Sequence, residues 1–255
     1  MRHSIKANPF IGFEKSKPRI PPLTRVYAVG DIHGRADLLD NLLAVIDADL
    51  AAHPVKHPIQ VFLGDYIDRG SDSKTVIDRL IERSRMQATV CLKGNHETFI
   101  LDFLEDPDIL DSWRRNGGLE TLISYGVTPS GRINSEERNR ISDALAHTLP
   151  AAHRSFIANL ATTYICGDYF FVHAGVRPDR RLSAQQEEDL LWIRDEFLFA
   201  DDNYGKVIVH GHEPVRAPDI RPNRINIDTG AYITGNLTCL VIEEDNLYFL
   251  SSHQD

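Results

Sequence analysis

Residues 59–70 read IQVFLGDYIDRG, an apolar run that ends in a glycine and a cluster of charged side chains. The bulky and β-branched residues predict a β-strand, and the glycine suits a tight turn at its carboxyl end. Two other stretches have the same build, RVYAVGDIHG at 25–34 and ATVCLKGNHE at 88–97. We therefore expect three strands, each followed by a polar turn.

Helical patterns separate these strands. Apolar residues recur at helix spacing between Leu38 and Leu50, and again between Val76 and Ile81 after a capping signal at residues 71–73. A further helix is expected from His96 onward. Alternation of strands and helices is typical of an α/β fold with a largely parallel first sheet.

The second half of the chain begins with a mostly helical segment at about 98–160, where Asn134 and Glu137 form a capping signal. From residue 161 onward β character returns in six runs, and a Gly-Asp turn joins the first two. These runs are ATTYICG, DYFFVHAG, KVIVHG, RINIDTG, LTCLVIEE and NLYFLSS.

The domain is expected to comprise residues 25–255. Residues 1–24 contain four prolines among scattered basic residues and are interpreted as an N-terminal extension. This extension is either partly ordered or a strap packed on the domain through Ile5, Phe10, Ile11 and Phe13.

Composition excludes several classes of protein. A net charge of −9 argues against a protein that holds nucleic acid by a general positive field. The three cysteines form no CxxC pair, which argues against a disulfide framework or a zinc ribbon. No apolar run reaches the roughly 18 residues of a spanning helix, and the first residues do not resemble a secretory signal. We therefore expect no membrane or nucleic-acid partner and a cytoplasmic location.

Five polar clusters follow strand-like runs, at the strand ends where ligands collect in open α/β sheets. They offer carboxylate and amide oxygens and imidazole nitrogens but no thiolate, a set that suits Mn, Fe or Zn. Two such ions about 3.5–4 Å apart can clamp the attacking and leaving oxygens of an in-line displacement, and a carboxylate can bridge them. The candidate ligands are Asp31, His33, Asp65, Asn95, His173 and His212.

The motifs GDIHG, GDYIDRG and GNHE, in this order, resemble the three signature motifs of the phosphoprotein phosphatase family within the calcineurin-like metallophosphoesterases. HAG and HGH resemble its two later histidine motifs. The resemblance runs from Arg25 to about Gly230, and the size and the WRRNGG segment at 113–118 are similar to the compact bacterial and phage members. It implies two central mixed sheets flanked by helices, an α/β/β/α sandwich.

The resemblance also implies a metal centre of two divalent ions, with Mn²⁺ as the first expectation and Fe, Zn or Ni as alternatives. Asp31 and His33 would hold the first ion. Asp65 would bridge the two. The second ion would be completed by Asn95, His173 and His212.

Roles in catalysis follow from the same resemblance. His96 would be the general acid that protonates the leaving oxygen, oriented by Asp68, because a carboxylate favours the charged form of an imidazole. Arg69, Asn95 and Arg194 would bind the substrate phosphate. A guanidinium fork matches phosphoryl oxygens bidentately.

Three features leave alternatives open. His210 is an imidazole that period-2 geometry places on the same side as His212, although His212 follows the glycine and fits the motif better. A substrate wall could be formed by Trp113, Asn116, Gly117 and Gly118, but a tryptophan that anchors a helix in the core before a Gly-Gly break is the preferred interpretation. Residues 228–230 lie either near the metals or in an ordinary strand-end turn.

The function implied is that of a phosphomonoester hydrolase in which a metal-bound hydroxide attacks phosphorus in line. A serine/threonine protein phosphatase is the first expectation, with a phosphorylated protein or a small phosphoester as substrate. The alternative is a hydrolase of dinucleoside tetraphosphates or other nucleotides with the same fold. A catalytically inactive relative is disfavoured because the ligand set is intact.

Overall fold

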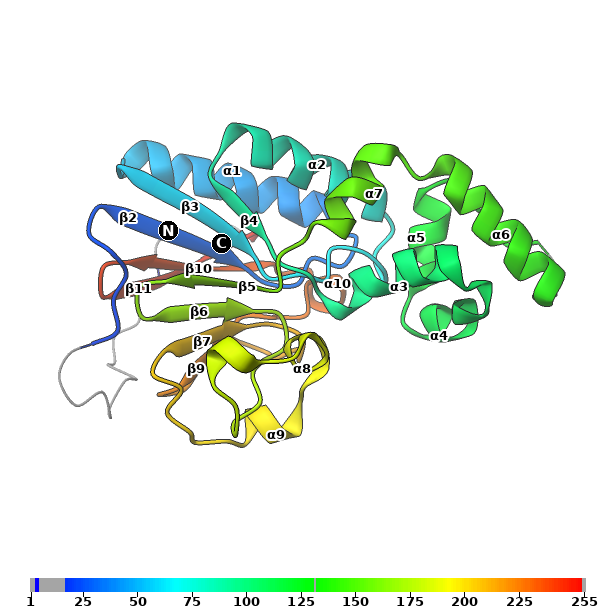
Figure 1. Cartoon of the computed structure of the whole chain (residues 1–255). Coiled ribbons are helices and arrows are strands. Elements are labelled where there is room, and N and C mark those ends of the chain that lie inside the picture. The colour runs from blue at the N-terminus through cyan, green and yellow to red at the C-terminus, as the bar shows by residue number, and fades with distance from the viewer. Residues whose placement is uncertain (1–2, 5–16, 131, 254–255) are drawn as a thin grey trace.

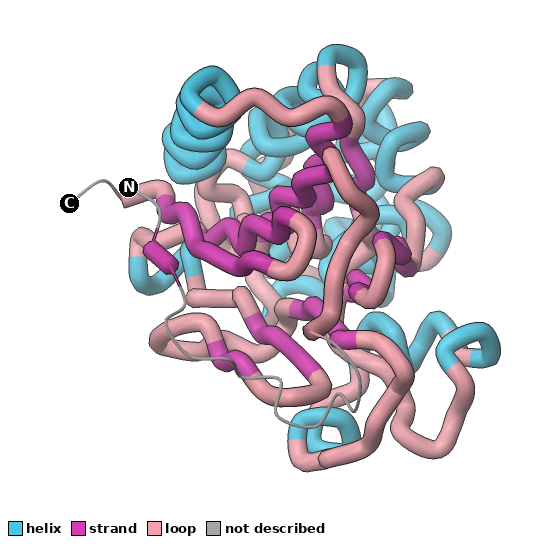
Figure 2. The backbone as a smooth tube through the Cα atoms, turned by 90° about the vertical axis from the view of Figure 1, so that its left-hand side faces the viewer, coloured by secondary structure: helices cyan, strands magenta, loops and turns pink. Residues whose placement is uncertain are grey.

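The computed structural model describes residues 3–4, 17–130 and 132–253. Two β-sheets lie face to face in the middle of the molecule, and helices cover them on the outside (Figures 1 and 2). This arrangement confirms the predicted sandwich of two mixed sheets flanked by helices.

The first sheet has the strand order β1-β11-β10-β2-β3-β4. Strands β2, β3 and β4 are parallel, whereas β10 and β11 run antiparallel to their neighbours. The bounds are β1 His3–Ser4, β2 Thr24–Val29, β3 His57–Phe62, β4 Thr89–Cys91, β10 Thr238–Glu243 and β11 Asn246–Ser251.

The second sheet has the order β5-β6-β7-β9-β8, with a parallel centre and antiparallel edges. The predicted Gly-Asp turn joins β5 to β6, where Cys166 pairs with Tyr169. The bounds are β5 Thr163–Cys166, β6 Tyr169–Val172, β7 Val207–His210, β8 Asp219–Ile220 and β9 Arg224–Asn226.

Strand alternation builds three apolar layers. In β2, Val26 and Ala28 enter the core between the sheets, while Tyr27 and Val29 face the helices outside the first sheet. The same alternation in β6 and β7 fills the core beneath the helices of the second sheet. Because both faces of the central strands are buried, those strands read as continuous apolar runs.

Helices α1 (Ala36–Ala52) and α2 (Ser73–Met86) cover the outer face of the first sheet (Figure 1). The predicted caps form: Asp72 Oδ1 accepts from Thr75 N at 3.3 Å, and Asn134 Oδ1 from Glu137 N at 2.9 Å. The helical segment, extending to one side, contains α3 Asn95–Glu105, η1 Pro107–Ile109, α4 Leu110–Arg115, α5 Gly118–Ser124, α6 Ser135–Thr148 and α7 Ala151–Ala158.

The second sheet carries shorter helices on its outer side: η2 Leu182–Ala184, α8 Glu187–Trp192 and α9 Asp195–Leu198. Helix α10 (Ala231–Thr234) precedes β10. Within the described ranges, no helix is both long and apolar enough to cross a membrane.

Residues 17–24 pack on the domain. Ile20 is buried in the core between the sheets, and its amide donates to the Glu244 carbonyl at 3.0 Å. The contacts expected of Ile5, Phe10, Ile11 and Phe13 lie outside the described residues.

Candidate active site

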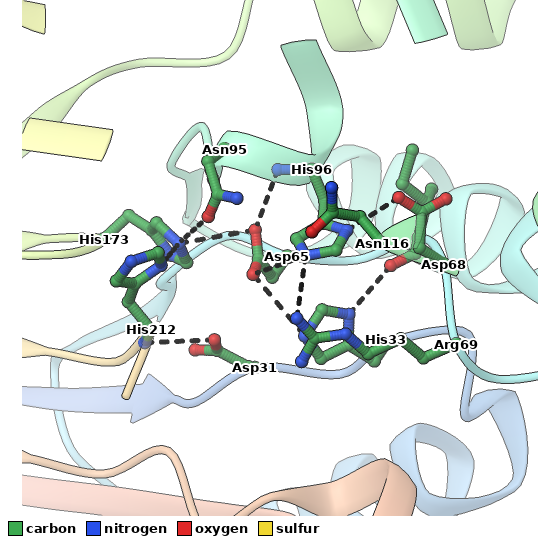
Figure 3. A network of polar contacts seen from close by, with 12 residues as sticks. Asp31, His33, Asp65, Asp68, Arg69, Asn95, His96, Asn116, His173 and His212 are labelled. Carbon is green, nitrogen blue, oxygen red and sulfur yellow. Dashed lines mark hydrogen bonds and ion pairs between the residues drawn. The ribbon is translucent and has the colours of Figure 1, made fainter. Parts of the chain in front are cut away.

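The polar clusters converge at one edge of the two sheets. Each follows a strand that points to this edge, namely β2, β3, β4, β6 or β7. The six candidate metal ligands and the His96–Asp68 pair are all buried, with exposed fractions of 7% or less. Figure 3 shows their side chains pointing toward one another, with Asp65 in the middle. Because the carboxyl ends of parallel strands meet at one edge, residues far apart in sequence become neighbours.

Asp65 lies between two groups of potential ligands. Its Oδ1 atom is 3.3 Å from His173 Nε2, and its Oδ2 atom is 3.5 Å from His33 Nε2. The atoms of His33, Asp65 and His96 form one group that could hold a metal ion, and those of Asp65, His173 and His212 form another. Asp65 belongs to both groups, as a carboxylate that bridges two ions must.

Backbone carbonyls orient two of the imidazoles. His33 Nδ1 lies 2.9 Å from the Ile67 carbonyl and His173 Nδ1 lies 3.0 Å from the Leu63 carbonyl. A carbonyl only accepts, so each Nδ1 carries the proton and each Nε2 keeps a lone pair directed into the site. Burial lowers the pKa of His33 to about 3, so its imidazole is neutral and able to bind a cation.

The second group closes around His173. Its Nε2 atom lies 2.9 Å from Asn95 Oδ1 and 3.1 Å from His212 Nδ1. Burial, together with the nearby His173, lowers the pKa of His212 to about 2. Several lone pairs thus converge within hydrogen-bond distance, an arrangement that a divalent cation would stabilise.

Buried atoms without partners support the same interpretation. Within the described part of the chain, Asp31 Oδ1 and His212 Nε2 are buried side-chain atoms without a hydrogen-bond partner. Asp31 Oδ2 accepts from the His212 amide at 3.1 Å, which joins the first and last motifs. Burial, with the Asp228 and Asp65 charges, raises the pKa of Asp31. This set of carboxylate oxygens and imidazole nitrogens suits a divalent first-row metal ion such as Mn, Fe or Zn.

His96 and Asp68 form a buried pair. His96 Nδ1 lies 2.7 Å from Asp68 Oδ2. Burial lowers the pKa of His96, but the Asp65 and Asp68 carboxylates outweigh it and raise the pKa above its ordinary value. The charged, proton-donating form is therefore favoured, as a general acid requires.

Arg69 lies beside this pair. Its Nη2 atom lies 3.1 Å from His96 Nε2. A guanidinium only donates, so Nε2 accepts in this contact, and it can donate to a leaving oxygen only once a phosphoryl oxygen takes up the Arg69 N–H group. The guanidinium also lies over the ring of Tyr232, 4.8 Å from the centroid. A cation–π contact of this kind holds the guanidinium in place.

Arg194 lies at the rim of the site. Its guanidinium forms an ion pair with Glu213, the residue after His212, and about half of its side chain is exposed. Its charge is among those that lower the pKa of His173 and His212. Its contact with the substrate phosphate stays a prediction.

Backbone strain concentrates here. Seven non-glycine residues in the described ranges have left-handed φ angles, and five of them belong to this site: His33, Asp65, Asp68, Arg69 and His212. Such conformations cost of order 1–3 kcal/mol each and persist where the surroundings impose them.

Glu97 has a role that sequence reasoning missed. Its buried carboxylate accepts from the amides of Gly94 at 2.9 Å, Asp65 at 3.0 Å and Tyr66 at 2.7 Å. It therefore ties the GNHE turn to the GDYIDRG turn. One sequence feature could have predicted this role. Glu97 lies three residues after Gly94, in the first turn of a helix, where a glutamate commonly accepts a hydrogen bond from the capping amide.

The structure also places His210 and Asp228, for which the sequence left two interpretations open. The chain turns after Gly211, so His210 does not share a side with His212; its buried ring packs against Phe197 at 5.0 Å. Asp228 is buried near the site, and burial and Asp65 raise its pKa to about 6.

Two stacked sheets with carboxylates and imidazoles gathered at their strand ends define a metallophosphoesterase hydrolase. Residues 24–247 match the family model of the calcineurin-like phosphoesterases, and the chain belongs to this family.

Among curated proteins, the chain is 26% identical over 235 residues to an asymmetrical bis(5'-nucleosyl)-tetraphosphatase of Anoxybacillus flavithermus, covering 83% of this chain and 88% of that protein. Among solved structures, a putative diadenosine tetraphosphatase is similar with a TM-score of 0.63 and 18% identity, over 94% of this chain and all of that chain. A protein serine/threonine phosphatase from Saccharomyces cerevisiae is similar with a TM-score of 0.55 and 16% identity, over 92% and 81% of the two chains.

Proposed function

We propose that this protein is a serine/threonine protein phosphatase with two divalent metal ions. The observation that carries the proposal is the buried His96–Asp68 pair, joined at 2.7 Å beside Arg69. Asp31, His33 and Asp65 would hold one ion, and Asp65, Asn95, His173 and His212 the other. Manganese is the first ion to test. When bound, the ions supply Lewis acidity, which activates water as a nucleophile and neutralises phosphoryl charge.

The chain's own side chains would carry out the other tasks. Arg69 donates two N–H groups to phosphoryl oxygens, with the Tyr232 ring keeping its guanidinium in place. The Asn95 amide nitrogen and Arg194 would add further donors. His96 then gives its Nε2 proton to the leaving oxygen, and Asp68 stabilises the imidazolium before transfer. Positioning and charge stabilisation of this kind account for most of the catalysis in phosphoryl transfer.

An oriented acid favours an alcohol as the leaving group. A serine or threonine alkoxide is a strong base and leaves only as it is protonated, whereas a nucleotide phosphate leaves readily as an anion. A buried imidazole whose pKa two carboxylates raise is therefore most useful on a phosphomonoester of an alcohol.

The second candidate is hydrolysis of a dinucleoside tetraphosphate. It is favoured by the names of the similar bacterial proteins and by the position of Trp192. This side chain is 38% exposed, and its ring centroid lies 6.3 Å from that of His212. An exposed aromatic ring beside the metal ligands can stack on a nucleobase.

A direct comparison distinguishes the two substrates. The metal-stripped protein, reloaded with Mn²⁺, is assayed on a phosphothreonine peptide and on diadenosine tetraphosphate. A higher kcat/KM for the peptide supports the protein phosphatase. A higher value for the dinucleotide, lowered by Trp192→Ala but not by the matched surface change Phe199→Ala, assigns the site to nucleotides instead.

A further inference from the structure

We propose that Trp113 and Thr121, from the helical segment, are positioning residues for the His96–Asp68 pair. By fixing Asp68, they would determine how fast the site hydrolyses esters whose leaving groups are strong bases. This inference rests on the proposed phosphomonoester hydrolase.

Both side chains donate to the Asp68 carboxylate. Trp113 Nε1 lies 3.0 Å from Oδ1 and 2.9 Å from Oδ2, and Thr121 Oγ1 lies 2.6 Å from Oδ1. Together with His96 Nδ1, three donors surround one carboxylate. All four residues are buried, with exposed fractions of 1% or less. Water does not replace these bonds, so each lost donor leaves the carboxylate freer to rotate.

The hydroxyl protons can be assigned by counting donors. Thr121 has a single hydroxyl proton, and the carboxylate at 2.6 Å can only accept it. Ser73 Oγ, 2.9 Å away, must then donate to Thr121 Oγ1, which also accepts from the Asp68 amide at 2.8 Å. One threonine thus holds both the side chain and the strained backbone of Asp68, whose φ is 72°.

The loop between Trp113 and Thr121 also packs closely against the Asp68–Arg69 turn. A Cβ atom on Gly118 would overlap the Trp113 ring, and one on Gly117 would lie 2.7 Å from Arg69 N. The Gly117 carbonyl accepts from the Arg69 amide at 3.0 Å. The two glycines let the segment from Trp113 to Thr121 lie directly against the Asp68–Arg69 turn.

Loss of these positioning contacts should slow esters with poor leaving groups more than esters with good ones. A misoriented imidazole slows the step in which a proton reaches the leaving oxygen. Hydrolysis of p-nitrophenyl phosphate needs little protonation, because p-nitrophenolate is a weak base, whereas phenyl phosphate needs more. Loosening of the whole domain would slow both substrates alike. The ratio of the two kcat values therefore separates positioning from general destabilisation.

The test compares wild type with Trp113→Phe and Thr121→Val, each of which removes a donor while keeping most of the volume. We expect kcat for phenyl phosphate to fall about tenfold more than kcat for p-nitrophenyl phosphate, a fraction of the 10²–10⁴ that a general acid contributes. Thr121→Ser keeps the hydroxyl and should restore the ratio. Phe103→Leu, at a ring packed 5.4 Å from Trp113, is the packing control and should leave the ratio unchanged.

A second measurement does not depend on turnover. The chain has two tryptophans, so Trp192→Phe assigns the indole N–H signal of Trp113 in a proton NMR spectrum. We expect Asp68→Asn to move that signal and to speed its exchange with solvent. An unmoved signal would overturn the inference.

The outcomes also separate the two proposals. If wild type hydrolyses neither ester, the proposed function fails, and the NMR result alone decides whether Trp113 holds Asp68. If wild type hydrolyses both and the ratio is unchanged in Trp113→Phe and Thr121→Val, the positioning role is wrong while the hydrolase stands.

Discussion

Replacing Glu97 by Gln should destabilise the protein strongly, although the two side chains have nearly the same shape. The carboxyl group accepts four backbone N–H groups at 2.7–3.4 Å, those of Gly94 and Asp65 at Oε2 and those of Tyr66 and Ile67 at Oε1, and is fully buried. A glutamine can keep its oxygen toward two of these donors, but its NH₂ group then faces the other two.

The magnitude follows from these contacts. Two unsatisfied buried N–H groups cost about 2 kcal/mol each. The sum is about 4 kcal/mol, a large share of the 5–15 kcal/mol that stabilises a typical domain. A chain of this size should lose roughly 10 °C in Tm.

The assay is urea unfolding of the metal-stripped protein, so that metal binding does not contribute to the measured stability. Glu105→Gln, an exposed residue of the same helix, is the control and should change the free energy of unfolding by less than about 0.5 kcal/mol. If Glu97→Gln is as stable as this control, Glu97 does not tie the two turns together.

Three further results are expected. His96→Asn should lower kcat on a phosphothreonine peptide by about 10²–10⁴-fold with the metal content unchanged, whereas loss of metal would make His96 a ligand instead. Asp65→Asn should lower metal content, measured by elemental analysis, by at least one ion per chain; full occupancy would contradict the bridging role. Arg177 donates to Asp189 at 2.6 Å and lowers the pKa of its carboxyl group, so Asp189 stabilises the folded state above its unfolded pKa of about 3.9 and loses this effect as pH falls below that value. Asp189→Asn should therefore lower Tm by about 2–4 °C at pH 7, and the difference should shrink as pH falls below about 3.9 toward the depressed pKa of the folded state, a pattern that a pH-independent difference would disprove.

The sequence predicted the sheets and the gathering of the clusters because both depend on local patterns. Strand runs, capping residues and glycines are visible within about ten residues. Parallel strands then bring their carboxyl ends to one edge whatever the chain does between them. For this reason the sequence alone predicts that Asp31 and His212, far apart along the chain, share one site.

What the sequence did not reveal depends on how separate segments dock. Trp113 was predicted to anchor a helix in the core, and it is buried, but nothing local shows that its N–H meets a carboxylate 45 residues earlier. The partners of Glu97 are backbone amides, which leave no trace in the sequence. The shared side assigned to His210 and His212 assumed a continuous strand, and the turn at Gly211 breaks that assumption.

The most direct test of the metal-dependent hydrolase is a metal titration of the stripped protein, following bound Mn²⁺ and hydrolysis of a phosphothreonine peptide together. We predict no turnover without metal and full activity at two bound ions per chain. Undiminished hydrolysis by the metal-free protein, or saturation at one ion, would contradict the two-metal site.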